Sequence, residues 1–124
     1  MGSHPINLAV RFILELAAWG AMGYWGWTQA EGPLRFVLAI GLPVAAAAIW
    51  GTFAVPNDPS RSGRAPVPVP GVVRLGIELV TFGFGAWALY DTGSSTLSLV
   101  FAAIVVVHYL VSYDRVAWLI RQPS

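Results

Sequence analysis

Two arginine–glutamate pairs lie inside apolar stretches of the sequence and are the side chains best placed to do chemistry. Arg11 precedes Glu15 by four residues, and Arg74 precedes Glu78 by the same spacing. That spacing puts both members of a pair on one face of a helix. Ionisable groups within membrane segments are costly and commonly mark a functional site. Each pair is therefore a candidate part of a binding or catalytic site.

A histidine and several aromatic residues extend this candidate site. Counted along helices at about 1.5 Å per residue, Glu15, Glu78 and His108 reach a similar depth. One polar layer would then contain these three candidate catalytic residues. The candidate ligand-binding residues around the layer are Arg11, Arg74, Trp19, Phe82, Tyr109, Tyr113, Asp114 and Trp50.

Acid–base chemistry and a structural role both fit these residues. A glutamate shielded from water can keep its proton and act as a general acid, and aromatic ring faces stabilise cations. This combination would suit protonation of an alkene or epoxide in an isoprenoid, by chemical analogy with terpene cyclases, although the sequence matches no cyclase. In the structural alternative, each arginine neutralises its glutamate and fixes helix packing, and His108 makes an interhelical hydrogen bond. The residues leave both interpretations open.

Metal and thiol chemistry are not expected. Two glutamates and one histidine lack the His-rich or Glu-x-x-His spacing of metal sites in helical bundles. The chain contains no cysteine, which excludes disulfides, iron–sulfur clusters and a catalytic thiol. We therefore expect no metal, no cofactor and no nucleic-acid partner.

The composition indicates helices in a membrane. Hydrophobic residues make up 56% and charged residues only 10% of the 124 residues, whereas about a quarter of residues are charged in soluble domains. The apolar runs cover about 7–28, 34–54, 71–90 and 96–119, each near the roughly 20 residues of a spanning helix. Because the runs are continuous rather than alternating, they predict an all-α, integral membrane four-helix bundle.

The two halves of the chain resemble each other. At an offset of 63 residues, Val10, Arg11, Glu15, Leu16 and Gly20 align with Val73, Arg74, Glu78, Leu79 and Gly83. We interpret this match as a duplicated helical hairpin with a pseudo-twofold axis along the membrane normal. One domain over 1–124 would contain hairpin one at about 7–54, a Pro-rich linker at 55–71 in extended geometry, and hairpin two at about 72–121.

The arginine positions predict an orientation in the membrane. Six of the seven arginines lie on the side of the chain ends and the linker, and only Arg35 lies on the other side. Positive residues concentrate in cytoplasmic segments. We therefore expect both termini and the linker in the cytoplasm, with the lipid bilayer as the first partner.

Several motifs together resemble a known family. They are Arg11–Leu16, the aromatic cluster Gly23–Trp27, the end of the second apolar run at Trp50–Pro56, and the second pair at Arg74 and Glu78. Across nearly the whole chain they look like the YrdB-like family of small bacterial membrane proteins. The resemblance implies a four-span protein of a bacterial inner (plasma) membrane. The function of that family is unknown, so the resemblance assigns no catalytic residue.

Four functions remain open at this point. The first is a protein that binds a small amphipathic or isoprenoid-like ligand in the polar layer and an aromatic cavity above it. The second is a membrane-embedded acid–base enzyme that acts on such a ligand. The third is a proton-coupled carrier, which would need a homodimer because four short spans enclose little volume. The fourth is an assembly subunit without a small-molecule role.

Overall fold

The computed structural model describes residues 5–56 and 65–122 and is built almost entirely of helices. This confirms the predicted all-α class. The elements in chain order are α1 (Pro5–Thr28), α2 (Pro33–Thr52), β1 (Phe53–Ala54), β2 (Val67–Pro68), α3 (Gly71–Asp91), α4 (Ser95–Val111) and α5 (Tyr113–Ile120).

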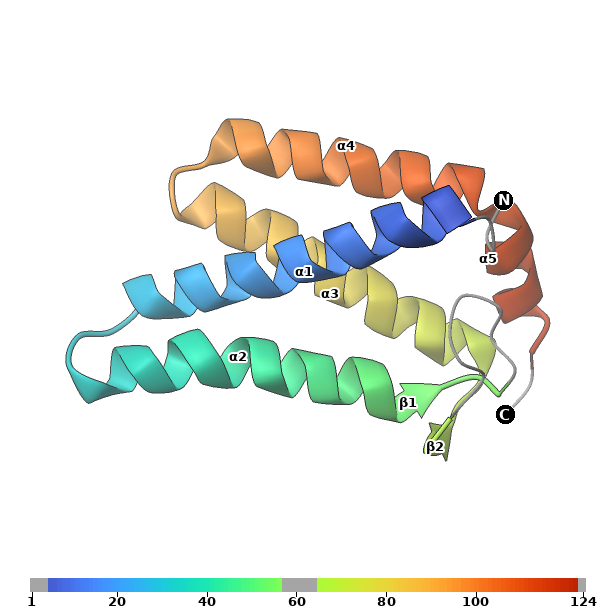
Figure 1. Ribbon diagram of the computed structural model, residues 1–124, viewed down its shortest axis with the longest axis horizontal. Helices are drawn as coiled ribbons and strands as arrows, with labels where there is room; N and C mark the ends of the chain where they lie inside the picture. Colours follow the sequence, from blue (N-terminus) through green and yellow to red (C-terminus); the bar gives the residue numbers. More distant parts are fainter. Residues whose placement is uncertain (1–4, 57–64, 123–124) are drawn as a thin grey trace.

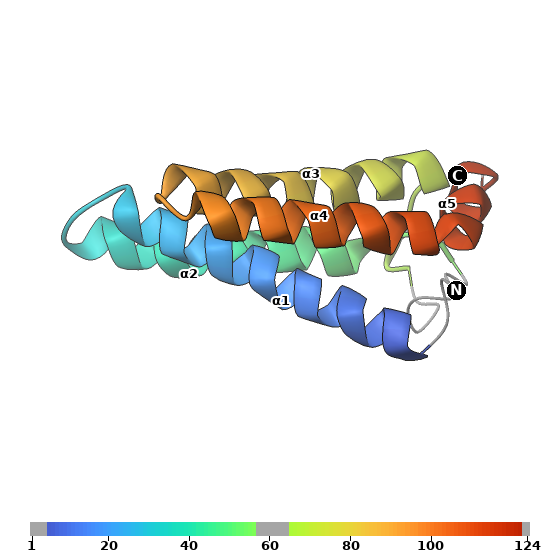
Figure 2. The same ribbon diagram turned by 90° about the horizontal axis from the view of Figure 1, so that it is seen from above.

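The long helices α1, α2, α3 and α4 lie side by side, and α5 crosses one end of them (Figures 1 and 2). Helices α1 and α3 cross at the centre, and each packs extensively against the next helix in the chain, α2 or α4. The α1–α2 and α3–α4 loops lie at one end. The start of α1, the end of α2, the start of α3 and all of α5 lie at the opposite end, which we call the α5 end.

Proline and glycine set the boundaries of the hairpins. Pro33 begins α2. The first N–H groups of a helix have no acceptor within the helix, so a proline at this position loses no hydrogen bond. Gly32 and Gly93, in the two hairpin loops, have φ angles of 65° and 89°, which glycine adopts without steric cost. Both hairpin loops therefore stay short.

The fourth apolar run is not one continuous span. We predicted a helix over about 96–119, but α4 ends at Val111 and α5 begins at Tyr113 after a bend of 71°. The bend turns Arg115 and Leu119 toward the bundle, where both are buried. Helices α1, α2 and α3 are each long and apolar enough to cross a membrane, and α4 and α5 qualify only as a bent pair.

The linker brings its two ends together. Strands β1 and β2 pair in parallel, with Phe53 opposite Val67 and Ala54 opposite Pro68. The Val69 N–H also donates to the Ala54 carbonyl oxygen at 3.0 Å. The extended conformation predicted for this Pro-rich segment is thus present as a short strand. Residues 57–64, with Arg61 and Arg64, lie outside the described residues.

The core is thin, and the outer helix faces are apolar. Its buried members are Leu14, Ala18, Trp50, Phe82 and Phe101. Large apolar side chains also point outward, such as Val80 at 71% and Leu99 at 72% exposed. Such faces are unfavourable in water and favourable in hydrocarbon. Together with the three spanning-length helices, they indicate a membrane protein.

Candidate functional site

Glu78 is the centre of a buried ionic cluster. Its side chain is 0% exposed, and its carboxylate is contacted by three arginines. Arg11 from α1 donates to Oε2 at 2.7 Å, Arg74 from α3 donates at 2.8 Å, and Arg115 from α5 donates at 2.7 Å. The Tyr109 hydroxyl of α4 donates to Oε1 at 2.8 Å. We call these five residues the Glu78 cluster.

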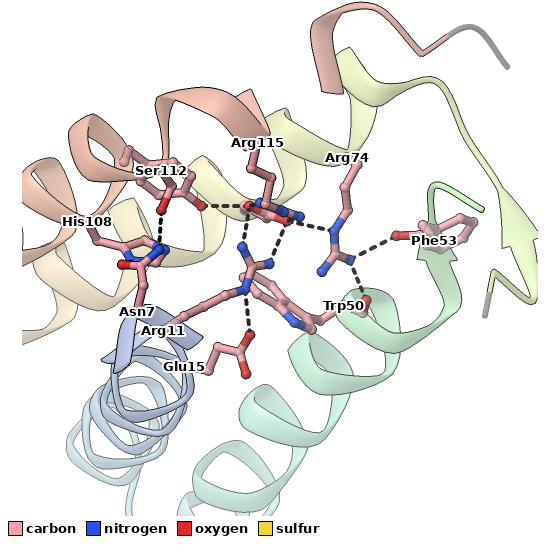
Figure 3. A network of polar contacts seen from close by, with 11 residues as sticks. Asn7, Arg11, Glu15, Trp50, Phe53, Arg74, His108, Ser112 and Arg115 are labelled. Atoms are coloured by element: carbon pink, nitrogen blue, oxygen red, sulfur yellow. Dashed lines mark hydrogen bonds and ion pairs between the residues drawn. The ribbon is translucent and has the colours of Figure 1, made fainter. Parts of the chain in front are cut away.

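The cluster joins helices that are far apart in sequence. Figure 3 shows three side chains pointing toward one another from different ribbons, those of Arg11, Arg74 and Arg115. Arg74 also donates to the backbone oxygens of Trp50 and, at 2.9 Å, of Phe53. It thereby satisfies carbonyl groups that α2 leaves unpaired at its C-terminus. The Glu78 carboxylate, its three arginines and Tyr109 therefore connect the five helices of the described residues.

The two predicted pairs are both present, and Arg11 connects them. Arg11 Nε donates to Glu15 Oε1 at 3.3 Å, and Arg74 Nε donates to Glu78 at 2.8 Å. Because Arg11 reaches both carboxylates, the structure brings the two glutamates to one guanidinium. Glu15 differs from Glu78 in being 13% exposed and in pairing with Arg11, whereas Glu78 pairs with three arginines.

Arg115 is the member of the cluster that sequence reasoning did not select. It was counted only among the arginines that predict orientation. In the structure it is 2% exposed and makes two hydrogen bonds to Glu78, at 2.8 and 2.7 Å. The sequence feature that could have identified Arg115 is its spacing of four residues from Leu119. This spacing places both side chains on one helix face, and that face is buried.

His108 belongs to a separate chain of polar side chains beside the cluster. Its Nδ1 lies 3.0 Å from Asn7 Oδ1, and Asn7 Nδ2 donates to Ser112 Oγ at 2.6 Å (Figure 3). All three residues are buried, with His108 4% exposed. We predicted that His108 shares one polar layer with Glu15 and Glu78. Its hydrogen-bond partner among the described residues is Asn7, a polar residue within an apolar run. We call Asn7, His108 and Ser112 the Asn7 chain.

The candidate aromatic residues fill the space beside the cluster. Trp50 lies 6.3 Å from Trp19 and 5.5 Å from Phe82, and Phe82 lies 6.1 Å from Tyr109, measured between ring centroids. The guanidinium carbons of Arg11 and Arg74 lie 5.2 and 4.5 Å from the Trp50 ring. These rings pack as core, so the aromatic cavity expected above the glutamates is occupied by the rings themselves.

Two candidate residues lie away from the cluster. Tyr113 is 71% exposed, and Asp114 is exposed beside it in the first turn of α5. The bend before α5 turns Arg115 inward and leaves these two neighbours on the outside. The structure therefore does not bring Tyr113 or Asp114 to Glu78.

The hydrogen bonds within the cluster occupy the positions on the Glu78 carboxylate at which a substrate could bind. Its two oxygens accept six hydrogen bonds, three each. A carboxylate offers about four lone-pair sites. Neither oxygen is available to a further donor without displacing an arginine or Tyr109. Among the described residues there is also no group of three metal-ligating side chains.

An open apolar groove runs between α1 and α4. It has a volume of about 420 Å³ and is lined by Ile6, Asn7, Val10, Ala103, Ile104, Val107, His108 and Val111. Its two polar lining residues are Asn7 and His108 of the Asn7 chain. Within the described part of the chain, His108 Nε2 is buried and has no hydrogen-bond partner. We call this feature the α1–α4 groove.

Two further grooves among the described residues are lined by no residue with an unsatisfied buried nitrogen. One of about 430 Å³ lies mainly between α2 and α3, and its Thr81 hydroxyl already donates to the Ile77 carbonyl oxygen at 2.8 Å. Another of about 530 Å³ lies along α4 and α5, between Tyr109 and Ile120. The α1–α4 groove is therefore the one of the three that is lined by a residue with an unsatisfied buried nitrogen, His108.

Comparison with known proteins places the chain in a family. Residues 9–106 match the family described as "Protein of unknown function (DUF2568)". The chain belongs to this family. It is also 42% identical over 116 residues to the uncharacterized protein YrdB of Bacillus subtilis (strain 168), which covers 94% of each chain. The YrdB-like resemblance is thus confirmed. No solved structure matches the chain.

Proposed function

We propose that this protein binds an amphipathic, lipid-like small molecule within the membrane, in the α1–α4 groove. The observation that carries the proposal is the pairing of apolar walls with one buried, unsatisfied nitrogen, His108 Nε2. Ligand pockets are typically about 300–1,000 Å³, mostly apolar, with a few polar groups that fix orientation. The groove, at about 420 Å³, has this character.

In this proposal the Glu78 cluster supports the groove and does not contact the ligand. Arg11 comes from α1 and Tyr109 from α4, the two helices that form the groove walls. Both side chains donate to the same carboxylate. The cluster would therefore hold the walls at a fixed separation, as rigid support does for binding sites in general.

The acid–base alternative has less support than binding. A catalytic acid must reach the reacting atom of its substrate. Glu78 is fully buried, and its oxygens are surrounded by donors. Glu15 is more accessible but lines none of the three grooves. We therefore place ligand binding ahead of cyclase-like proton transfer.

The proposed setting is the bacterial inner (plasma) membrane, with the α5 end toward the cytoplasm. The support is the arginine distribution, because four of the five arginines among the described residues belong to elements at that end, and Arg35 lies in the first turn of α2 after the outer loop. The Asn7 chain would then lie near the cytoplasmic headgroups. A ligand would keep its polar head there and its hydrocarbon along α1 and α4.

Blocking the groove tests the proposal. Val107 lines the groove and is 57% exposed, whereas its neighbour Val106 is 56% exposed and lines none of the three grooves. We expect the wild-type protein, purified in mild detergent, to retain a lipid-like molecule detectable by native mass spectrometry. Val107→Trp should lose this molecule, and the matched control Val106→Trp should keep it. Equal retention by both variants, or no bound molecule in the wild type, would contradict the proposal.

A further inference from the structure

The Asn7 chain determines which His108 nitrogen can accept a hydrogen bond. Asn7 Nδ2 donates to Ser112 Oγ at 2.6 Å, which leaves Asn7 Oδ1 facing His108 Nδ1 at 3.0 Å. In this orientation of the Asn7 amide the hydrogen between them is on Nδ1, because a carbonyl oxygen can only accept. In a neutral imidazole the other nitrogen then carries a lone pair. His108 Nε2 is therefore an acceptor.

A neutral ring is the form that fits these surroundings. Within the described residues, the one hydrogen bond of His108 is to the neutral amide of Asn7. Its ring contacts the ring of Tyr109 at 5.3 Å between centroids. A buried charge is costly unless a counter-charge pairs with it. No carboxylate lies within hydrogen-bonding distance of His108 in the described parts of the chain.

Resting on the proposed function, we propose that the α1–α4 groove selects an uncharged long-chain alcohol, whose hydroxyl donates to His108 Nε2. A buried acceptor without a partner is unfavourable, and a donor head would satisfy it. The remaining walls are hydrocarbon, from Ile6, Val10, Ala103, Ile104, Val107 and Val111. They match an extended alkyl or isoprenoid chain.

The lining of the groove also disfavours charged heads. None of its lining residues is an arginine, lysine, aspartate or glutamate. A carboxylate or phosphate head would therefore find no cation in the groove, and an ammonium head would find no anion. The arginines of the cluster are already directed to Glu78. Among simple lipid heads, a hydroxyl supplies a donor without a charge.

Matched probes of one chain length test this selectivity. The full-length protein in nanodiscs would be titrated with hexadecan-1-ol, its methyl ether, hexadecanoate and hexadecane, with binding followed by native mass spectrometry. The alcohol can donate to Nε2, whereas the ether can only accept. We expect the alcohol to bind about tenfold more tightly than the ether, as one ordinary hydrogen bond provides. His108→Phe should bind both equally.

A spectroscopic measurement covers the case in which His108→Phe does not fold. In wild-type protein labelled with ¹⁵N-histidine, Nε2 of His108 should show the shift of a nitrogen without hydrogen. That signal should move when hexadecan-1-ol is added and stay when the methyl ether is added. His4→Gln, changed outside the described residues, removes the second histidine signal.

The outcomes separate the two proposals. If no probe binds, the proposed function itself fails, and the alcohol inference fails with it. If all probes bind equally, the groove is a binding site, but selection by His108 is wrong. Tighter binding of the ether or of hexadecanoate, or an Nε2 signal typical of N–H, would also overturn the inference and leave the proposed function standing.

Discussion

Among single residues, Glu78 is the buried carboxylate that pairs with three arginines from three different helices. Burying one carboxylate among three arginines is tolerable because hydrogen bonds satisfy both of its oxygens. Glu15 has the same spacing from its arginine, yet it is partly exposed. The sequence repeat predicted two equal pairs, and the structure shows a central carboxylate and a peripheral one.

Removing the charge of Glu78 should therefore be far more damaging than removing that of Glu15. Glu78→Gln leaves Arg11, Arg74 and Arg115 without their shared counter-charge, a change that costs about 3–5 kcal/mol in buried pairs. Glu15→Gln should cost about 1 kcal/mol or less, because Arg11 keeps Glu78. Thermal unfolding in detergent measures both. Similar Tm values for the two variants would contradict the central role of Glu78.

Sequence reasoning found the residues that are close in sequence and missed those that come from elsewhere. The pairs at spacing four followed from helix geometry alone. Arg115, Asn7 and Ser112 reach the site only because α5 and α4 fold back against α1 and α3. No spacing rule relates Asn7 to Ser112, 105 residues apart. Their identification required the tertiary structure.

At the scale of elements, α5 is the part that sequence reasoning described least well. The run 96–119 is mostly apolar, and neither Ser112 nor its neighbours are proline or glycine, so no helix-breaking residue indicates the bend. The bend of 71° instead places Arg115 against Glu78 and Leu119 in the interior. The break is thus explained by a tertiary ion pair and not by a helix-breaking residue.

Removing Arg115 should release α5 alone. Arg115→Leu deletes the two hydrogen bonds that join α5 to Glu78, while Arg11, Arg74 and Tyr109 continue to satisfy that carboxylate. We expect amide hydrogen exchange to rise in α5 and to stay near the wild-type rate in α1 and α3. Arg121→Gln, at an exposed arginine just after α5, is the control and should leave exchange unchanged. Unchanged α5 exchange in Arg115→Leu would argue against the ion pair as its anchor.

At the scale of the whole molecule, the apolar surface and the arginine bias give an orientation. The α5 end should face the cytoplasm, and the two hairpin loops should face outward. The duplication behind this arrangement stays a prediction. Some equivalent positions share environments, since Leu16 is 50% and Leu79 is 49% exposed, and a Cβ at Gly20 or Gly83 would meet nothing within 4 Å, whereas Glu15 and Glu78 differ in burial.

Single cysteines test the orientation, and the chain has no native cysteine to interfere. Pro66→Cys places an exposed thiol in the linker, and Ser95→Cys places one at the start of α4 by the outer loop. In intact cells, an impermeant maleimide should label the Ser95→Cys thiol. It should label the Pro66→Cys thiol only after the membrane is opened. The reverse pattern would place the α5 end outside.

Photo-crosslinking would show directly whether a lipid-like molecule occupies the α1–α4 groove. A C16 alcohol with a diazirine in its chain would be irradiated with the protein in nanodiscs, and labelled residues would be identified by mass spectrometry. We expect the labels to concentrate at residues that line the groove, Val10, Ala103, Ile104 and Val107, and to disappear with excess hexadecan-1-ol. Labels spread evenly over exposed apolar residues such as Ile40 and Val44 of α2, with no competition, would contradict binding in the groove.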